Sequence, residues 1–204
     1  MKKLILVLIL TIVTLLTLPC SGVWAAAPTN RVHGMLDKVM AIQNNPALQG
    51  EAHREQRREA IQKVILDNFN FQSMAKEALG KQWEKLARKQ RSEFEDVFQV
   101  LFGDSYTRLV LNFLHREKIS YQQETIHGKT AEVKTTIYRS DEEIPVNYRL
   151  ASAQKGWLVT DVTIDGVSIV ENYRKTFARV IQRQSFQSLM DKMRLQQRAI
   201  KKES

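Results

Sequence analysis

Apolar residues recur at helical spacing through the first half of the chain and alternate with polar residues in the second half. Apolar positions three and four residues apart predict four helices there. These helices cover Val32–Ile42, about Glu51–Asp67, Phe71–Leu79 and about Arg88–Leu114. Gly80 suits the left-handed position that follows a helix, and the first helix should end near Asn44-Asn45-Pro46. We expect the long fourth helix to bend or break at Gly103-Asp104.

From Ile119 onward the period changes to two, which is typical of strands that bury one face. His127-Gly128, Ser140-Asp141 and Gln154-Lys155-Gly156 are turn sequences between the alternating runs. They predict four antiparallel strands joined by short turns, the last of which is Trp157–Ile164. Pro145 belongs at a strand start or an edge, because it has no backbone N–H to donate.

Helical spacing returns after the fourth strand. Asp165-Gly166 is a turn pair, and Ser168 followed by Glu171 has the spacing of a capping box that starts an amphipathic helix. A last helix carries Phe186, Leu189, Met190 and Met193, and the basic tail from Arg194 to Ser204 is expected to fray. Helices packed on a four-stranded antiparallel sheet make an α+β fold.

The N-terminus has the pattern of an export signal. Lys2 and Lys3 precede an apolar run from Leu4 to Leu18, and Val23-Trp24-Ala25 fits a small-x-small cleavage site. The run has about 15 apolar residues where a membrane-spanning helix needs about 20. Residues 1–25 are therefore interpreted as a cleavable signal peptide. Because Leu18-Pro19 before Cys20 is a poor lipobox, a soluble exported protein is favoured over a lipoprotein.

Residues 26–204 then form a single domain without cysteine, which excludes disulfides, zinc–thiolate sites and cysteine nucleophiles. Two of the 31 Lys and Arg residues lie in the signal, so the remaining 29 exceed the 22 acidic residues by seven. Export removes most of the case for nucleic acid as the partner of this charge. Anionic lipid head groups are the more plausible partner, although any single lysine more simply keeps a helix face solvated. We expect a monomer.

Two blocks of sequence carry a resemblance to a known family. The segment D-V-x-I-D-G-V-S-I at Asp161–Ile169 is followed by N-Y-R-x-x-F at Asn172–Phe177. An upstream block consists of Phe69-Asn-Phe71, Met74-Ala-Lys76, Ala78-Leu-Gly80, Trp83 and the run Gln90, Phe94 and Phe98. In this order and spacing, over roughly residues 65 to 190, the chain resembles the MlaC / toluene-tolerance family of periplasmic phospholipid-binding proteins.

The resemblance implies a curved four-stranded antiparallel sheet embraced by helices, likened to the cone of nuclear-transport-factor-2-like proteins. It implies a soluble periplasmic carrier that shields acyl chains in an apolar cavity between sheet and helices. Its partners would be phospholipid, an outer-membrane lipoprotein–porin complex, and the lipid-binding subunit of an inner-membrane ABC transporter. Phospholipid would be cargo, so no cofactor is expected.

An aromatic stripe on a helix is usually core, but the resemblance makes the side chains that face the sheet candidates for a lipid cavity. The predicted lining residues are Met74, Leu79, Trp83, Phe98, Val133, Ile137, Tyr148, Leu150, Val162, Val167, Ile169 and Tyr173. Arg174 is the head-group candidate, because a guanidinium fork suits phosphate. The alternative, a structural pair of Arg174 with Asp161 or Asp165 that fixes the turn, is favoured.

Catalytic hypotheses find little support in the residues. The four histidines lack the spacing of a helical metal pair, and Ser168 lacks a nucleophile elbow. Asp161 with Tyr121 or Tyr148 could mimic the acid–base pair of a cone-shaped isomerase, but we expect its carboxylate to contact solvent or Arg174. No catalytic or metal-ligating residue is therefore predicted. The alternatives that stay open are a carrier of another apolar ligand, such as a hopanoid or hydrocarbon, and a ligand-free adaptor of the transporter.

Overall fold

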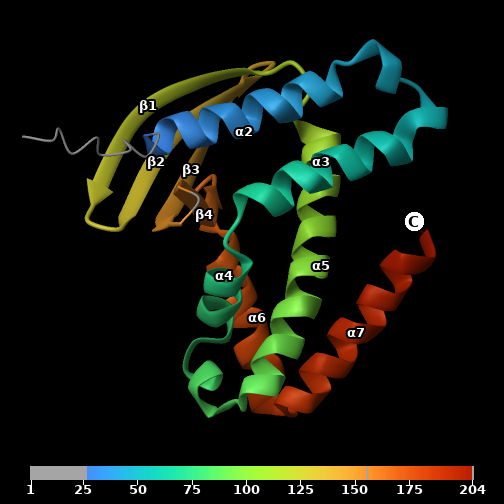
Figure 1. The fold of residues 1–204 in the computed structure, drawn as a ribbon, viewed down its shortest axis with the longest axis vertical. Coiled ribbons are helices and arrows are strands. Elements are labelled where there is room, and N and C mark those ends of the chain that lie inside the picture. The colour runs from blue at the N-terminus through green and yellow to red at the C-terminus, as the bar shows by residue number, and fades with distance from the viewer. Residues whose placement is uncertain (1–26, 155, 204) are drawn as a thin grey trace, which may run out of the picture.

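The computed structural model describes residues 27–154 and 156–203, in which a curved sheet is crossed by one helix and continued by a set of further helices (Figure 1). The predicted signal peptide, residues 1–25, lies outside the described residues. None of the helices in the described part combines the length and the apolar character needed to cross a bilayer.

The helices agree closely with the periodicity. They are α2 (Pro28–Gln43), α3 (Arg54–Asn68), α4 (Phe71–Leu79), α5 (Arg88–Phe113), α6 (Ile169–Arg183) and α7 (Phe186–Glu203), with short 3-10 turns η1 (Pro46–Leu48), η2 (Glu51–His53) and η3 (Gly80–Lys85). Gly80 follows α4 with a positive φ of 53°, which glycine adopts without a Cβ clash, but its ψ of −130° differs from the left-handed helical value that was predicted. Asn70 begins α4, because its Oδ1 accepts the N–H of Ser73 at 3.0 Å.

The expected break in the long helix is wrong, because α5 runs without interruption from Arg88 to Phe113. Gly103 lies inside α5, where a Cβ would be in ordinary van der Waals contact, 3.5 Å from Cδ2 of Leu66 on α3. Asp104 is buried within the helix and is held by ion pairs with Arg58 and Arg108. Asp104 therefore joins α3 to α5 through Arg58, and the Gly-Asp pair does not end α5.

The sheet has five strands in the order β1-β2-β3-β4-β5, all antiparallel. The strands are β1 (Lys118–His127), β2 (Thr130–Arg139), β3 (Glu142–Ala153), β4 (Gly156–Ile164) and β5 (Val167–Ser168). Four strands were predicted, and β5 was missed because two residues are too short to show an alternating pattern. Asp165 (φ 47°) and Gly166 (φ 77°) form the tight turn that returns the chain onto β4. The likeness to a nuclear-transport-factor-2 cone stays a prediction.

Asp161 joins the sheet to α6. Its side chain is buried, and its carboxylate accepts the hydroxyl of Ser168 at 2.6 Å and the N–H of Val170 at 3.1 Å. Ser168 caps α6 as predicted, since its Oγ accepts the N–H of Glu171 at 3.0 Å. The expectation that Asp161 contacts solvent or Arg174 is wrong, because Arg149 on β3 is the cation near it, at 3.5 Å.

Aromatic rings connect the helices. Phe94, Phe98, Phe102 and Tyr106 stand four residues apart on α5 and therefore share one face. Neighbouring rings along this stripe have centroids 5.2–5.8 Å apart. The stripe also contacts rings from other elements, namely Phe69, Phe71, Tyr173, Phe177 and Phe186. Each such pair contributes about 0.5–1.5 kcal/mol beyond the area it buries.

The C-terminal helix extends further than expected. Fraying was predicted from Arg194 onward, but α7 continues to Glu203. Leu189, Met190 and Met193 are buried, and Arg194 pairs with Glu93 of α5 at 3.1 Å. Ile200, further along α7, is partly buried against the core as well, so the helix keeps contact with the rest of the molecule beyond Arg194.

We predict that Asp161→Ala lowers the free energy of unfolding by about 2–3 kcal/mol, because it leaves a buried N–H and a hydroxyl without an acceptor. Ser168→Ala should lower it by about 1 kcal/mol through loss of the cap. Chemical denaturation followed by circular dichroism measures both changes. Asp96→Ala, at an exposed position of α5, is the control and should change the free energy by less than about 0.5 kcal/mol. A loss for Asp161→Ala no larger than for this control would contradict the assigned role.

We also predict that stability declines at alkaline pH. Burial raises the pKa of Tyr106, Tyr148 and Tyr173, and it raises the pKa of Tyr121 to about 12. The folded state thus holds these phenol protons more tightly than the unfolded chain, whose tyrosines titrate near pH 10. Their contribution is fully present below about pH 10 and is lost as the pH rises toward about 12.

Urea unfolding at a series of pH values across this window measures the decline. Tyr148→Phe should make the decline shallower, which separates the tyrosines from lysines that titrate in the same range. If the free energy of unfolding falls equally steeply with pH in the variant and the wild type, Tyr148 does not contribute to the alkaline loss of stability.

Candidate functional site

An apolar cavity of about 330 Å³ lies between α2, the C-terminal half of α5 and the sheet. This volume falls within the range of small-molecule sites, about 300–1,000 Å³. Two charged residues, Arg139 and Glu142, are part of its lining. The other lining residues are Met35, Leu36 and Val39 from α2, Ile65 and Phe69, then Tyr106, Leu109, Val110, Phe113 and Leu114 along α5, and Ile137, Ile144, Val146, Tyr148 and Ile164 from the sheet.

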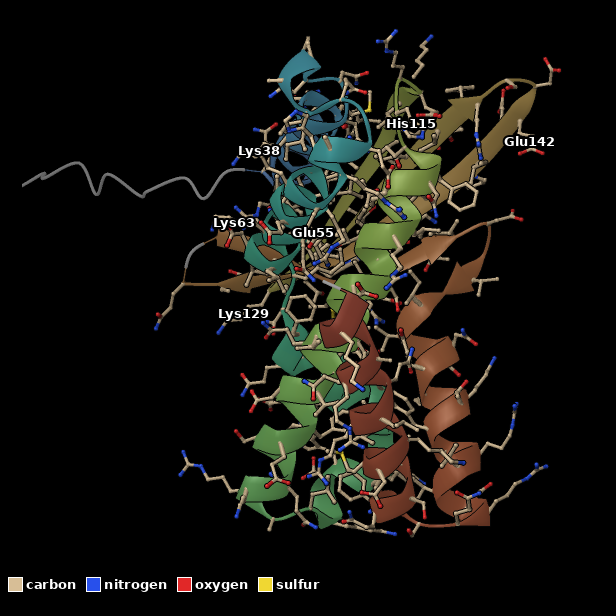
Figure 2. All side chains as sticks on the ribbon, turned by 90° about the vertical axis from the view of Figure 1, so that its right-hand side faces the viewer. Lys38, Glu55, Lys63, His115, Lys129 and Glu142 are labelled. Carbon is tan, nitrogen blue, oxygen red and sulfur yellow. The ribbon has the colours of Figure 1, made fainter. Side chains whose placement is uncertain are left out.

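The strand pattern explains why the cavity lies at one end of the sheet. Along β2, Val133 is 1% exposed while Ile137, four residues on, is only partly buried. On β3, Leu150 is 0% exposed while Ile144 is partly buried. The helices therefore cover the same apolar face tightly at one end and leave space at the other. That open end is the β2–β3 turn, where His115 and Glu142 also lie (Figure 2).

The two phenols in the cavity wall stay uncharged over the whole physiological range. Tyr148 lines it from β3 and Tyr106 from α5. Burial raises the pKa of both phenols, so each keeps its proton at neutral pH. Phe113, which is 51% exposed, stands at the rim. The site can shelter an apolar ligand, and its charged residues are confined to the open end.

Some of the predicted lining residues lie at the cavity, and most of the others lie in or against the packed core. Ile137 and Tyr148 line the cavity. A second group is packed in the core away from it, namely Met74, Leu79, Trp83, Phe98, Val133, Leu150 and Val162. Ile169 and Tyr173 are partly buried and pack against that core. Lipid contact by any of these residues stays a prediction.

Val167 was predicted to line the cavity, but the residue is 60% exposed. It belongs to β5, which pairs with β4 through Ile164 opposite Val167. Successive side chains of a strand point to opposite faces. Ser168 points toward Asp161, and its neighbour Val167 therefore points to solvent.

Arg174 lies on α6, which contributes no residue to the cavity lining. Its guanidinium is half exposed and pairs with Glu171 at 2.6 Å, and this hydrogen bond raises the pKa of Arg174. The favoured alternative, pairing with Asp161 or Asp165, is wrong, because the partner is a glutamate one helical turn away, and the head-group role of Arg174 stays a prediction. The structure therefore does not place Arg174 at the cavity mouth.

Sequence reasoning missed the helical walls of the cavity. Met35, Leu36 and Val39 were recognised as the apolar side of a helix, and Leu109 and Phe113 as part of a helical pattern. A sign of their role is that apolar residues continue along α5 beyond the aromatic stripe, up to the exposed Phe113 in its last turn. Within the described residues, no group of three or more His, Cys, Asp or Glu side chains could hold a metal ion.

Known proteins share this architecture. A phospholipid-binding protein from Ralstonia solanacearum, whose structure was solved in complex with a phospholipid, superposes with a TM-score of 0.71 at 22% identity. The similarity covers 84% of this chain and 99% of that one and is a likeness of fold.

The sequence comparisons agree with the resemblance seen in the two motif blocks. The intermembrane phospholipid transport system binding protein MlaC of Haemophilus influenzae is 21% identical over 141 residues. That match spans 67% of this chain and 66% of the relative, slightly less than two thirds of the relative's own length. The family model described as MlaC protein matches residues 33–195, from α2 into α7. The chain belongs to the MlaC family.

Proposed function

We propose that this protein is a periplasmic phospholipid carrier that holds acyl chain in the apolar cavity between α2, α5 and the sheet, with the head group outside. The observation that carries the proposal is this cavity, about 330 Å³ and lined almost entirely by apolar side chains. Membership of the MlaC family supports it, as does the Ralstonia solanacearum protein of the same fold, which was solved with a phospholipid.

Binding would rest on shielding rather than on directed contacts. Removing one methylene from water contributes about 0.8 kcal/mol, so an acyl chain in the cavity is strongly favoured over the same chain in water. A chain in a bilayer is already out of water, however, and gains little more on transfer to the protein. A carrier of this kind exchanges lipid reversibly with a membrane, and its partners set the direction.

The proposed route follows from this exchange. Residues 1–25 would export the chain to the periplasm as a cleavable signal peptide. The carrier would then exchange phospholipid with the lipid-binding subunit of an inner-membrane ABC transporter and with an outer-membrane lipoprotein–porin complex. Loading would require α2 and α5 to move transiently apart from the sheet, because the cavity lies between these elements. No catalytic step forms part of the proposal.

Filling the cavity tests the proposal. We predict that Ile137→Trp lowers the amount of phospholipid that co-purifies with the protein at least about fivefold, because an overpacked site costs about 1–3 kcal/mol. The full chain is expressed in a Gram-negative host and purified without detergent. Native mass spectrometry and lipid extraction then measure the bound lipid, and thermal unfolding verifies that the variant is folded.

Ile126→Trp is the matched control, since Ile126 is 51% exposed on β1 and does not line the cavity. It should retain wild-type lipid. A polycyclic lipid or hydrocarbon in place of phospholipid would favour the carrier of another apolar ligand. Wild-type protein that carries no lipid in any preparation would overturn both carrier hypotheses and leave the transporter adaptor.

A further inference from the structure

A polar pocket of about 460 Å³ adjoins the apolar cavity. It lies between the C-terminal end of α2, the connection from α5 to β1, and the β2–β3 turn. Arg139 lines both the polar pocket and the apolar cavity. An apolar space and a polar space are therefore adjacent and share one guanidinium, at the end of the molecule where His115 and Glu142 lie (Figure 2).

Three cations line this polar pocket, which we call the basic pocket: Arg116, Lys118 and Arg139. The Nε of Arg116 donates to Oδ1 of Asn44 at 2.8 Å, which positions the side chain. The guanidinium of Arg139 stands 5.2 Å from the ring centre of Phe113, and the ammonium of Lys118 stands 5.8 Å from the ring of Tyr138. Contacts with aromatic faces orient a cation without neutralising it.

These charges are not paired with carboxylates. Within residues 27–154 and 156–203, none of the three cations has a carboxylate oxygen within ion-pair distance. The acid that lines the basic pocket, Glu117, accepts the backbone N–H of His115. Glu142 stands opposite Arg139 in the strand register but forms no ion pair with it. By contrast, Arg174 and Arg194 elsewhere on the surface do pair with glutamates.

We propose that the basic pocket binds the phosphate of the lipid whose acyl chain occupies the apolar cavity. This inference rests on the proposed carrier function. Arginine presents a planar fork of donors that matches phosphate oxygens in two-point contact, and lysine adds a mobile point charge. A free phosphate compound would leave the adjoining apolar cavity empty, whereas a phospholipid carries its phosphate next to its acyl chains and could occupy both spaces. The shared position of Arg139 matches that arrangement.

The test measures phosphate preference as a ratio of two lipids. Vesicles contain phosphatidylglycerol together with a minor fraction of diacylglycerol that has the same acyl chains and no phosphate. Protein is incubated with the vesicles and re-isolated, and mass spectrometry gives the ratio of the two lipids bound, relative to their ratio in the vesicles. Because both lipids share the apolar cavity, the ratio does not depend on how well that cavity binds chains.

Wild-type protein should favour phosphatidylglycerol, and Arg116→Gln with Lys118→Gln should reduce this preference about tenfold. Adding Arg139→Gln should reduce it further, and raising the salt concentration should weaken it in the wild type. The control is Lys38→Gln with Lys129→Gln, which removes the same charge from exposed positions on the side of the molecule away from Glu142 (Figure 2). This control should keep the wild-type ratio.

An unchanged ratio in the Arg116 and Lys118 double variant would overturn the inference, and so would an equal fall in the control. Glycerophosphoglycerol, which carries the phosphate without chains, should leave the ratio unaltered when present at the concentration of the lipid. If it abolishes the preference at that concentration, the pocket is a site for free phosphate compounds and not for the lipid. Uptake of neither lipid by the wild type would instead overturn the proposed function itself.

Discussion

The structure depends on the aromatic stripe of α5. Four rings at intervals of four residues give one helix a continuous face about 18 Å long, and rings from the α3–α4 connection, α4, α6 and α7 pack against it. Because rings interdigitate at close contact, this part of the molecule is filled. The same helix continues past the stripe with Leu109, Val110 and Phe113, and there the opposing surface is the sheet. One helix therefore forms both the solid core and the wall of the cavity.

This division gives the two halves different mechanical properties. The half held by aromatic pairs is also tied by Asp161, whose buried carboxylate joins β4 to the start of α6. The half around the cavity is bounded mostly by aliphatic side chains of α2, α5 and the ends of β2 and β3, and the rings of Phe69 and Tyr106 stand between the two halves. Contacts across a void contribute less dispersion energy. Separation of α2 and α5 from the sheet would thus cost less than disruption of the aromatic half.

Much of the fold could be predicted because long elements repeat their pattern many times. The bounds of α4 and the turns between β1, β2, β3 and β4 follow directly from periodicity and turn residues. A strand of two residues, β5, has no period to detect, and Gly103 lies inside a continuous helix although glycine often ends one. The site was harder, because alternation identifies the apolar face of β2 and β3 but not how closely the helices approach it. Ile137 and Val133 look alike in sequence, and only the packing above them differs.

Sequence alone also does not show which charged residues are paired in the folded protein. In a lipid carrier, this pairing affects which lipid is selected. Arg174 seemed suited to a head group because it adjoins an apolar stripe, yet Glu171 one turn away neutralises it. Arg139 lies in an ordinary alternating strand, and its proposed role comes from its position between an apolar and a polar space, where none of the described carboxylates forms an ion pair with it. Shielding in an apolar cavity distinguishes poorly between lipids of equal chain length, since it scales with buried area alone. In the proposed carrier, discrimination would therefore come from polar groups at the mouth, where a directed contact can be made without burying a charge.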